Sequence, residues 1–187
     1  MITTEISNAL KILEKQQTLL YPTDTVWGIG CDATSENAVT KVFKIKQRAE
    51  SKSLIILVDD IEMLKSYVSK ISEETLKFIA TISKPTTIIY QNPIGLAKNV
   101  VAKDNTVAIR IVQNEFCKQL IKAFGKPIVS TSANISNKPT PKSFKEIETS
   151  ILHSVDYIVN LQQEVINEKS STILKVAENG EISVLRK

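Results

Sequence analysis

The chain has 187 residues, 42% of them hydrophobic and 24% charged, and its formal net charge is +4. This is enough chain for one domain over residues 1–187 with a substantial core. No run approaches the roughly 18 apolar residues of a membrane span, and the N-terminus does not resemble a signal peptide. We therefore expect a cytoplasmic protein without a membrane partner. The small positive charge allows an anionic ligand but does not by itself indicate nucleic acid.

The two cysteines, Cys31 and Cys117, lie far apart in the sequence and have no partners at metal-ligand spacing. Together with the one histidine, His153, they cannot complete a four-ligand zinc site without carboxylates. We expect both thiols to be reduced and buried, and no metal to be bound by side chains at a recognisable spacing.

Hydrophobic periodicity predicts helices and strands that alternate along the first half of the chain. In chain order these are a helix over 5–16, strands over 18–21 and 26–31, a helix that begins at Ser35, a strand over 54–58, and helices over 60–69 and 72–82, the second capped by Ser72. The run from Leu54 to Val58 is wholly apolar, which is typical of a strand buried on both faces. Gly28 and Gly30 would let another backbone or a ligand come close to their strand.

The second half continues the alternation. In chain order it contains strands over 86–90 and 106–112, a helix from the cap Asn114 to Phe124, a strand over 127–131, a helix that begins at Ser143, and strands over 156–160, 172–176 and 182–186. Ser143 and Glu146 have the spacing of a capping box, and Gly125 is placed to close the preceding helix. The whole pattern predicts an α/β fold with a twisted, mixed sheet and flanking helices.

No glycine-rich phosphate loop is present, because the five glycines never reach the spacing of a dinucleotide fingerprint or a P-loop. Ser132 and His153 could be imagined as nucleophile and base, but no nucleophile elbow surrounds the serine. Any bound phosphate would therefore have to be held by long cations and hydroxyl groups.

A basic segment offers such cations: Lys41, Lys44, Lys46, Arg48 and Lys52, opposed within that span only by Glu50. Cations at the end of a helix are favoured by its dipole, so capping and solubility explain part of this charge. Lys44 and Arg48, four residues apart on the expected helix, should repel each other unless an anion lies between them. A phosphate site and simple capping both remain open at this point.

Hydroxyl groups gather at the carboxyl end of the strand over 127–131, in the segment Ser130-Thr131-Ser132-Ala133-Asn134-Ile135-Ser136. Ligands of open α/β sheets bind at this end of the strands, although an ordinary polar turn is the alternative. Arg110 stands within an otherwise apolar strand and has no obvious acidic partner nearby in the sequence. Its burial would be costly without an anion, which could be a ligand carboxylate or phosphate, or the acid of a salt bridge on an edge strand.

Taken together, these segments resemble the YrdC-like family of threonylcarbamoyl-AMP synthases, in its short single-domain form. The motifs that carry the likeness are Tyr21-Pro22-Thr23-Asp24-Thr25-Val26-Trp27-Gly28-Ile29-Gly30, Lys46-Gln47-Arg48 with Lys52-Ser53-Leu54-Ile55, Val107-Ala108-Ile109-Arg110, Ser132-Ala133-Asn134 within 127–136, and Ser171-Thr172-Ile173 with Leu185-Arg186. They span essentially the whole chain. The segment 82–87 departs from the turn that the family has there, and Ala49 replaces the proline that follows the family's arginine.

The resemblance implies a twisted sheet around a large, basic, concave cavity. It implies an enzyme, a nucleotidyltransferase that condenses L-threonine, bicarbonate and ATP to threonylcarbamoyl-AMP and pyrophosphate. The product would serve tRNA modification, because it feeds N6-threonylcarbamoyladenosine (t6A) formation in tRNA that reads codons starting with A. The further partners that the resemblance implies are tRNA and the downstream threonylcarbamoyl-transferase proteins.

The resemblance also assigns residues. Lys46 and Arg48 are the implied catalytic cations, and Mg²⁺ is expected to be bound mainly through the phosphates of ATP. The residues implied for ATP are Lys46, Arg48, Lys52, Thr106, Ser132, Asn134, Thr140 and Arg186, and those implied for L-threonine are Thr25, Arg110, Ser130 and Ser171. Fixed cations would stabilise charge that develops on the phosphoryl oxygens, so no protein nucleophile is required.

Two other functions remain open at the level of sequence. An RNA-binding or ribosome-maturation module could use the same basic cavity, and it would show strongly salt-dependent affinity. Against it stand the small net charge and an aromatic content of 5%. A transferase that uses carbamoyl phosphate would be separated by testing that substrate in place of bicarbonate.

Overall fold

The structure is a computed structural model, and it describes residues 1–49, 54–167, 170–177 and 181–186. Its helices are α1 (Ile2–Glu14), α2 (Glu36–Lys46), α3 (Ile61–Tyr67), α4 (Glu73–Ala80), α5 (Glu115–Phe124) and α6 (Thr149–Ser154), with 3-10 turns η1 (Lys98–Val100) and η2 (Phe144–Glu146). Its strands are β1 (Leu19–Tyr21), β2 (Gly28–Gly30), β3 (Ile55–Val58), β4 (Thr86–Gln91), β5 (Thr106–Ile111), β6 (Ile128–Ser132), β7 (Tyr157–Ile158), β8 (Thr172–Val176) and β9 (Ile182–Arg186).

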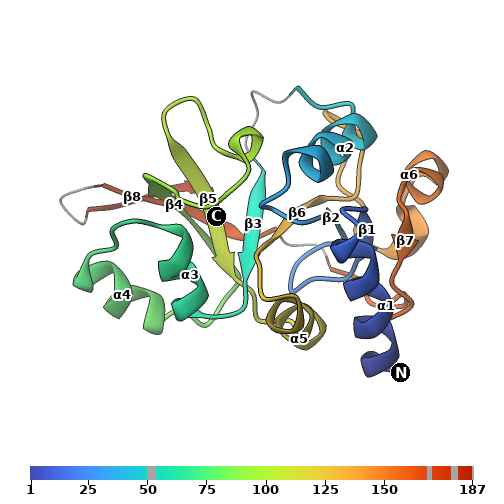
Figure 1. Cartoon of the computed structure of the whole chain (residues 1–187), viewed down its shortest axis with the longest axis horizontal. Helices are drawn as coiled ribbons and strands as arrows, with labels where there is room; N and C mark the ends of the chain where they lie inside the picture. Colours follow the sequence, from blue (N-terminus) through green and yellow to red (C-terminus); the bar gives the residue numbers. More distant parts are fainter. Residues whose placement is uncertain (50–53, 168–169, 178–180, 187) are drawn as a thin grey trace.

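The described strands form one sheet in the order β7-β1-β2-β6-β3-β5-β4-β8-β9. The pairs β1/β7, β3/β5 and β4/β8 are parallel, and the other neighbours are antiparallel, so the sheet is mixed. Figure 1 shows α3 and α4 beside the β4 and β8 end of the sheet, and α6 near β7 at the other end. The predicted α/β class with a mixed sheet and flanking helices is confirmed.

The sheet separates two apolar clusters. On one face α1 and α5 contact each other and bury Leu13, Phe116 and Leu120 against strand residues such as Tyr21 and Leu57. The other cluster is built from the remaining helices and the opposite face of the strands, and it contains Trp27, Val42, Phe43, Ile56 and Ile109. Within β3, Ile56 and Leu57 belong to different clusters, so the strand expected to be buried on both faces is indeed buried on both.

Several helix ends follow from short polar side chains, as the sequence predicts. The hydroxyls of Ser35 and Ser72 and the amide of Asn114 accept hydrogen bonds from the backbone N–H three residues later. Gly125 ends α5 with φ of 70°, a left-handed conformation that favours glycine. These polar caps and the glycine mark where α2, α4 and α5 begin and where α5 ends.

Two predicted helical features are wrong. The helix expected from Ser143 is instead the 3-10 turn η2 and the separate helix α6, because Ile147 between them is extended and buried. Ser143 makes no capping bond, and the carboxylate of Glu146 accepts from the backbone N–H of Lys142 instead. The helix also does not reach Arg48, as the repulsion expected between Lys44 and Arg48 requires: α2 ends at Lys46, and Gln47 is left-handed with φ of 49°. Arg48 is therefore off the helix and cannot repel Lys44 across one of its turns.

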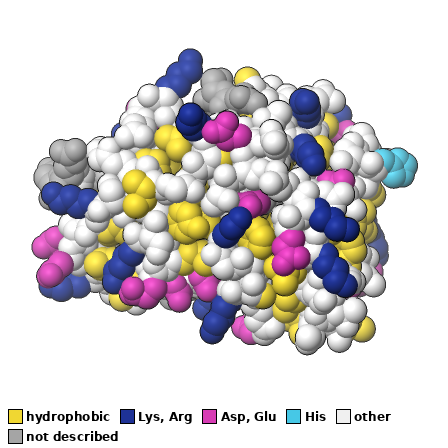
Figure 2. Space-filling view, viewed as in Figure 1, with side chains coloured by type: hydrophobic (Ala, Val, Ile, Leu, Met, Phe, Trp, Pro, Cys, Tyr) yellow, Lys and Arg dark blue, Asp and Glu magenta, His cyan; other side chains and the backbone are white. Residues whose placement is uncertain are grey.

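The surface agrees with the small net charge, and the cysteines are buried as expected. Cys31 and Cys117 are buried and unpaired. On the face in Figure 2, lysines and arginines are interspersed with acidic side chains and do not gather into one basic patch. Among the described residues, the helices include none that is long and apolar enough to cross a bilayer.

Candidate active site

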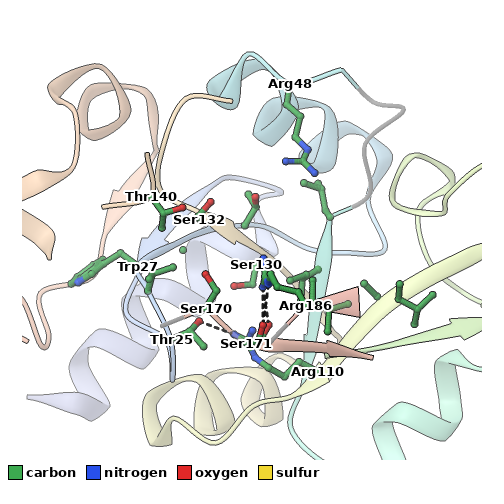
Figure 3. A pocket seen from close by; sticks show the side chains of 18 residues that line it. Thr25, Trp27, Arg48, Arg110, Ser130, Ser132, Thr140, Ser170, Ser171 and Arg186 are labelled. Carbon is green, nitrogen blue, oxygen red and sulfur yellow. Dashed lines mark hydrogen bonds between the residues drawn. The ribbon is translucent and has the colours of Figure 1, made fainter. Parts of the chain in front are cut away.

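A cavity of about 290 Å³ lies over one part of the sheet (Figure 3). Its floor is a row of neighbouring residues, because Ile55 pairs with both Ser130 and Ala108, and Ala108 pairs with Ile89. The adjacent row on this face contains Leu57, which pairs with Arg110 and belongs to the core beneath α1 and α5. Arg110 therefore stands where the apolar core ends and the cavity begins.

Three arginines from distant parts of the chain line this cavity. Arg48 follows α2, Arg110 lies in β5 and Arg186 ends β9. In Figure 3 the side chain of Arg48 points down into the cavity from above, with Arg186 and Arg110 on the opposite side. Burial lowers the pKa of Arg48, and burial followed by the charge of Arg110 lowers the pKa of Arg186. Guanidinium groups keep their proton at such sites, so the cavity is positively charged.

Hydroxyl groups make up most of the remaining polar lining: Thr25, Ser130, Thr131, Ser132, Thr140, Ser170 and Ser171. Among the described residues the lining contains no carboxylate, imidazole or thiol. No group of three or more metal-ligating side chains occurs in the described part of the chain. The cavity thus offers cations and short hydrogen-bonding groups, which suit phosphate and carboxylate oxygens.

Lys46 holds the hydroxyl-rich turn from behind and does not line the cavity. It is 1% exposed, and its ammonium donates to the backbone carbonyl oxygens of Ser132 and, at 2.7 Å, of Asn134. The backbone carbonyl of Lys46 in turn accepts from Ser136 N at 2.8 Å. Burial, and after it the charge of Arg48, lower the pKa of Lys46 to about 7. The two sequence motifs are therefore physically joined by this one side chain.

The partner of Arg110 is an acid that lies far away in the sequence, so an ion pair, one of the alternatives left open by the sequence, is present. Its Nη2 is 3.0 Å from Asp24 Oδ1 and donates at 3.4 Å to Thr25 Oγ1. The side chains of Asp24 and Arg110 are only 7% and 3% exposed. The strand β5 lies inside the sheet, between β3 and β4. The ion pair of Arg110 is therefore not on an edge strand, which is where that alternative placed it.

Arg186 closes the cavity at the end of the sheet through Ser171. Its Nε and Nη2 donate to Ser171 O at 3.2 and 2.9 Å, as the dashed lines in Figure 3 show. Ser171 is buried, and its hydroxyl lies 2.8 Å from the hydroxyl of Thr87 on β4. The hairpin of β8 and β9 thus brings the last arginine of the chain onto the residue that precedes β8.

The structure brings most of the sequence-predicted site residues together. The cavity is lined by Thr25, Arg48, Arg110, Ser130, Ser132, Thr140, Ser171 and Arg186. Lys46 and Asn134 lie behind it, and the amide of Asn134 donates to Lys138 O at 2.7 Å. Thr106 is not in the lining, since its hydroxyl donates to Asp104 at 2.7 Å, and Lys52 lies outside the described residues.

Three members of this region have no role in the assignment made from the sequence. Thr131 and Ser170 also line the cavity, and each is the direct neighbour of a residue that was predicted. Asp24 lies behind Arg110, and the sequence analysis names it only as a member of the motif from Tyr21 to Gly30. The cost of burying an arginine was the signal that could have found it, if the search for an acid had extended beyond the strand of Arg110 itself.

Comparison with known protein families identifies the family of this chain. The sequence profile of the Sua5/YciO/YrdC family, described as "Telomere recombination", matches residues 11–187. The chain belongs to this family. The resemblance inferred from the motifs is thereby confirmed, and the family includes proteins with the same mixed α/β sheet.

Individual members of the family show how similar this chain is to its relatives in sequence and in structure. The chain is 36% identical over 148 residues to the threonylcarbamoyl-AMP synthase of Psychromonas ingrahamii, with 77% of each protein covered. It is 35% identical over 183 residues to the synthase of Pseudoalteromonas translucida, with 95% of each covered. The structure of P. abyssi Sua5 complexed with L-threonine superposes with a TM-score of 0.86 at 27% identity over 97% of this chain. This chain spans only 53% of that longer protein.

Proposed function

We propose that this chain is a threonylcarbamoyl-AMP synthase, an enzyme that forms threonylcarbamoyl-AMP and pyrophosphate from L-threonine, bicarbonate and ATP. The observation that carries the proposal is the convergence of Arg48 and the turn at Ser132 on one cavity with Arg110 and Arg186. The names of the curated relatives, which share 31–36% identity, support it, as does the threonine complex of the Sua5 relative. Residues 1–187 would act as a single domain of this kind.

The chemistry needs little beyond position and charge. The amine of L-threonine captures carbon dioxide as a carbamate, and a carbamate oxygen then attacks the α-phosphorus of ATP. A new P–O bond forms while the bond to pyrophosphate breaks, and the electron pair leaves with the pyrophosphate. Negative charge grows on the phosphoryl oxygens and the leaving group, so cations fixed there stabilise the transition state more than the ground state.

We assign the two ends of the cavity to the two substrates. Arg48, Ser132 and Thr140 would contact the phosphates, with Lys52 and Arg186 as further ATP contacts. Thr25, Arg110, Ser130 and Ser171 would hold L-threonine, with Arg110 binding its carboxylate. Lys46 and Asn134 would serve by holding the turn at Ser132 in place, because both side chains are already bonded to that turn or the loop after it.

Mg²⁺ would enter with ATP as part of the substrate. The described lining offers guanidinium and hydroxyl groups and no carboxylate, which does not fit a resident site for this ion. We therefore propose that the phosphates hold it, and assign no step to it. Release of threonylcarbamoyl-AMP to a downstream transferase that modifies tRNA completes the proposed role, and it makes tRNA and that transferase the expected partners.

The test is product formation by the purified chain. With ATP, L-threonine and bicarbonate together, we expect pyrophosphate and threonylcarbamoyl-AMP in equal amounts, and neither when any one substrate is omitted. Arg48→Ala should lower kcat/KM by about 100- to 1000-fold, as for loss of one donor at a developing charge. Lys44→Ala is the matched control, because Lys44 is an exposed cation at the same end of α2 and lies outside the cavity lining.

Two results would refute the proposal. One is ATP turnover that ignores threonine, and the other is an Arg48→Ala variant that folds and keeps full activity. Salt-dependent binding of RNA without any threonine-dependent product would favour the RNA-binding module instead. Product formed from carbamoyl phosphate but not from bicarbonate would identify the transferase.

A further inference from the structure

Asp24 is a buried carboxylate directly behind the cavity wall. It is not part of the described lining, yet its Oδ1 lies 3.0 Å from Arg110 Nη2. Its other oxygen, Oδ2, accepts a hydrogen bond of 3.0 Å from the backbone N–H of Gln113, just beyond the end of β5. One carboxylate thus contacts both the guanidinium and the chain that follows the strand carrying it.

The turn that carries Asp24 is fixed by its own hydrogen bonds. The hydroxyl of Thr23 donates to Val26 O at 2.8 Å and accepts from Thr25 N at 3.0 Å. The hydroxyl of Thr25 lies 3.0 Å from that of Thr23 and accepts from Arg110 at 3.4 Å. Asp24 and Thr25 are neighbours in this turn, and both contact the same guanidinium. The hydrogen bonds of the turn therefore fix the position of the Asp24 carboxylate relative to the Thr25 hydroxyl.

The described residues do not satisfy every hydrogen-bond donor of the Arg110 guanidinium. Its Nε is buried and has no hydrogen-bond partner among the described residues. An N–H group in this condition is costly to bury, so the protein alone does not satisfy this guanidinium. Arg110 lines the cavity, and its Nη2 donates to Thr25 and forms an ion pair with Asp24, whose Oδ1 accepts no hydrogen bond from the described residues.

We propose that Asp24 is a positioning residue for the amino-acid substrate: it holds the plane of Arg110 so that the remaining donors meet the substrate carboxylate. Recognition of a carboxylate by arginine depends on the orientation of the planar fork, and small misplacements cost much of the binding. Without the acid, the guanidinium keeps only the 3.4 Å bond to Thr25 among the side-chain contacts of the described residues. The inference rests on the proposed function of this cavity.

The experiment compares Asp24→Asn and Asp24→Glu with wild type in the synthase assay. Asn can keep the bond from Gln113 N but loses the charge, whereas Glu keeps the charge and moves it by one methylene. Both should raise KM for L-threonine, Asn by about 10-fold, as when an orienting partner is lost behind a ligand side chain. KM for ATP should stay within about twofold, because the phosphate end is untouched.

Asp32→Asn is the matched control. Asp32 is also a buried acid in an ion pair, 3.3 Å from Lys126, but neither residue lines the cavity. Its substitution should lower stability without changing either KM. A threonine KM of Asp24→Asn that stays at the wild-type value, or falls, overturns the inference, because a fall would mean that Asp24 competes with the substrate for Arg110.

Separate measurements distinguish loss of folding from loss of substrate binding. The fluorescence of Trp27 reports whether each variant is folded, and if Asp24→Asn is not, Asp24→Glu alone decides, since an unchanged threonine KM there would also refute positioning. If wild type forms no threonine-dependent product, the proposed function fails. Calorimetric titration of L-threonine then tests the inference by itself, since equal affinity in wild type and the folded Asp24 variant refutes it.

Discussion

Lys46 provides the sharpest quantitative test, because its ammonium is buried and still bonded to backbone carbonyls. In the folded protein its pKa is lowered to about 7, whereas the usual value is 10.5. Between these values the unfolded chain binds a proton that the folded chain does not, so the unfolding free energy rises with pH. Below about pH 7 the lysine is protonated in both states and this dependence disappears.

The size of the effect follows from the shift. Each pH unit well inside the window adds up to about 1.4 kcal/mol, so raising the pH from about 7 to about 8.5 should add about 1.5 kcal/mol. Lys46→Met lacks the titrating group. Its unfolding free energy should lie below that of wild type, because two carbonyl oxygens lose their donor at about 1–3 kcal/mol each. The gap between the two proteins should then widen as the pH rises.

Urea denaturation followed by Trp27 fluorescence measures this gap, since Trp27 is the single tryptophan and is buried beside the cavity. Groups other than Lys46 titrate in both proteins, so they cancel in the difference. A gap that stays constant or narrows between about pH 7 and 8.5 would show that Lys46 keeps its proton in the folded state. If Lys46→Met does not fold, Lys46→Gln gives the same comparison, because it keeps an amide donor for the turn.

The two glycines of β2 should separate stability from substrate binding. A Cβ at Gly30 would lie 2.3 Å from Val129 O and 2.6 Å from the ring of Tyr21, so Gly30→Ala should destabilise by about 3 kcal/mol in urea denaturation. Near-wild-type stability would contradict this packing. A Cβ at Gly28 would meet mainly the rotatable hydroxyl of Ser130, at 3.0 Å. Gly28→Ala should therefore cost less than about 1 kcal/mol yet raise KM for L-threonine several-fold, and an unchanged KM would place Ser130 outside the threonine site.

The parts of the fold that the sequence predicts are those decided by local chemistry. The caps at Ser35, Ser72 and Asn114 depend on one side chain and one nearby N–H, and all three are confirmed. The helix expected from Ser143 failed because its local signal was overruled: Ile147 reaches the core in an extended conformation. Periodicity alone cannot distinguish one helix from two short turns that bury the same residues.

The residues of the site also divide into those that local sequence predicts and those that depend on contacts between distant segments. Arg48, Ser132 and Arg110 were found from residue type and spacing, and they do line one cavity. The sequence names Lys46 but not the contacts it makes, and it does not single out Asp24, because the contacts of each join segments that are distant in the sequence. Lys46 contacts the turn after β6, and Asp24 contacts β5. Contacts of this kind depend on strand order, and the order β6-β3-β5 places far-apart segments next to each other.

These supports share one electrostatic arrangement. Arg110 has a carboxylate behind it, Arg186 donates to the backbone carbonyl of Ser171, and Lys46 donates to the carbonyls of the hydroxyl-rich turn. Negative charge or partial charge thus lies on the protein side of these cations, while the described cavity lining contains no carboxylate. Such backing lowers the cost of burying Lys46 and Arg110 and orients all three cations, yet it leaves the cavity itself positive. Charge is therefore balanced locally rather than over the whole surface, which is why a net charge of only +4 is compatible with a cavity suited to a triphosphate and a carboxylate.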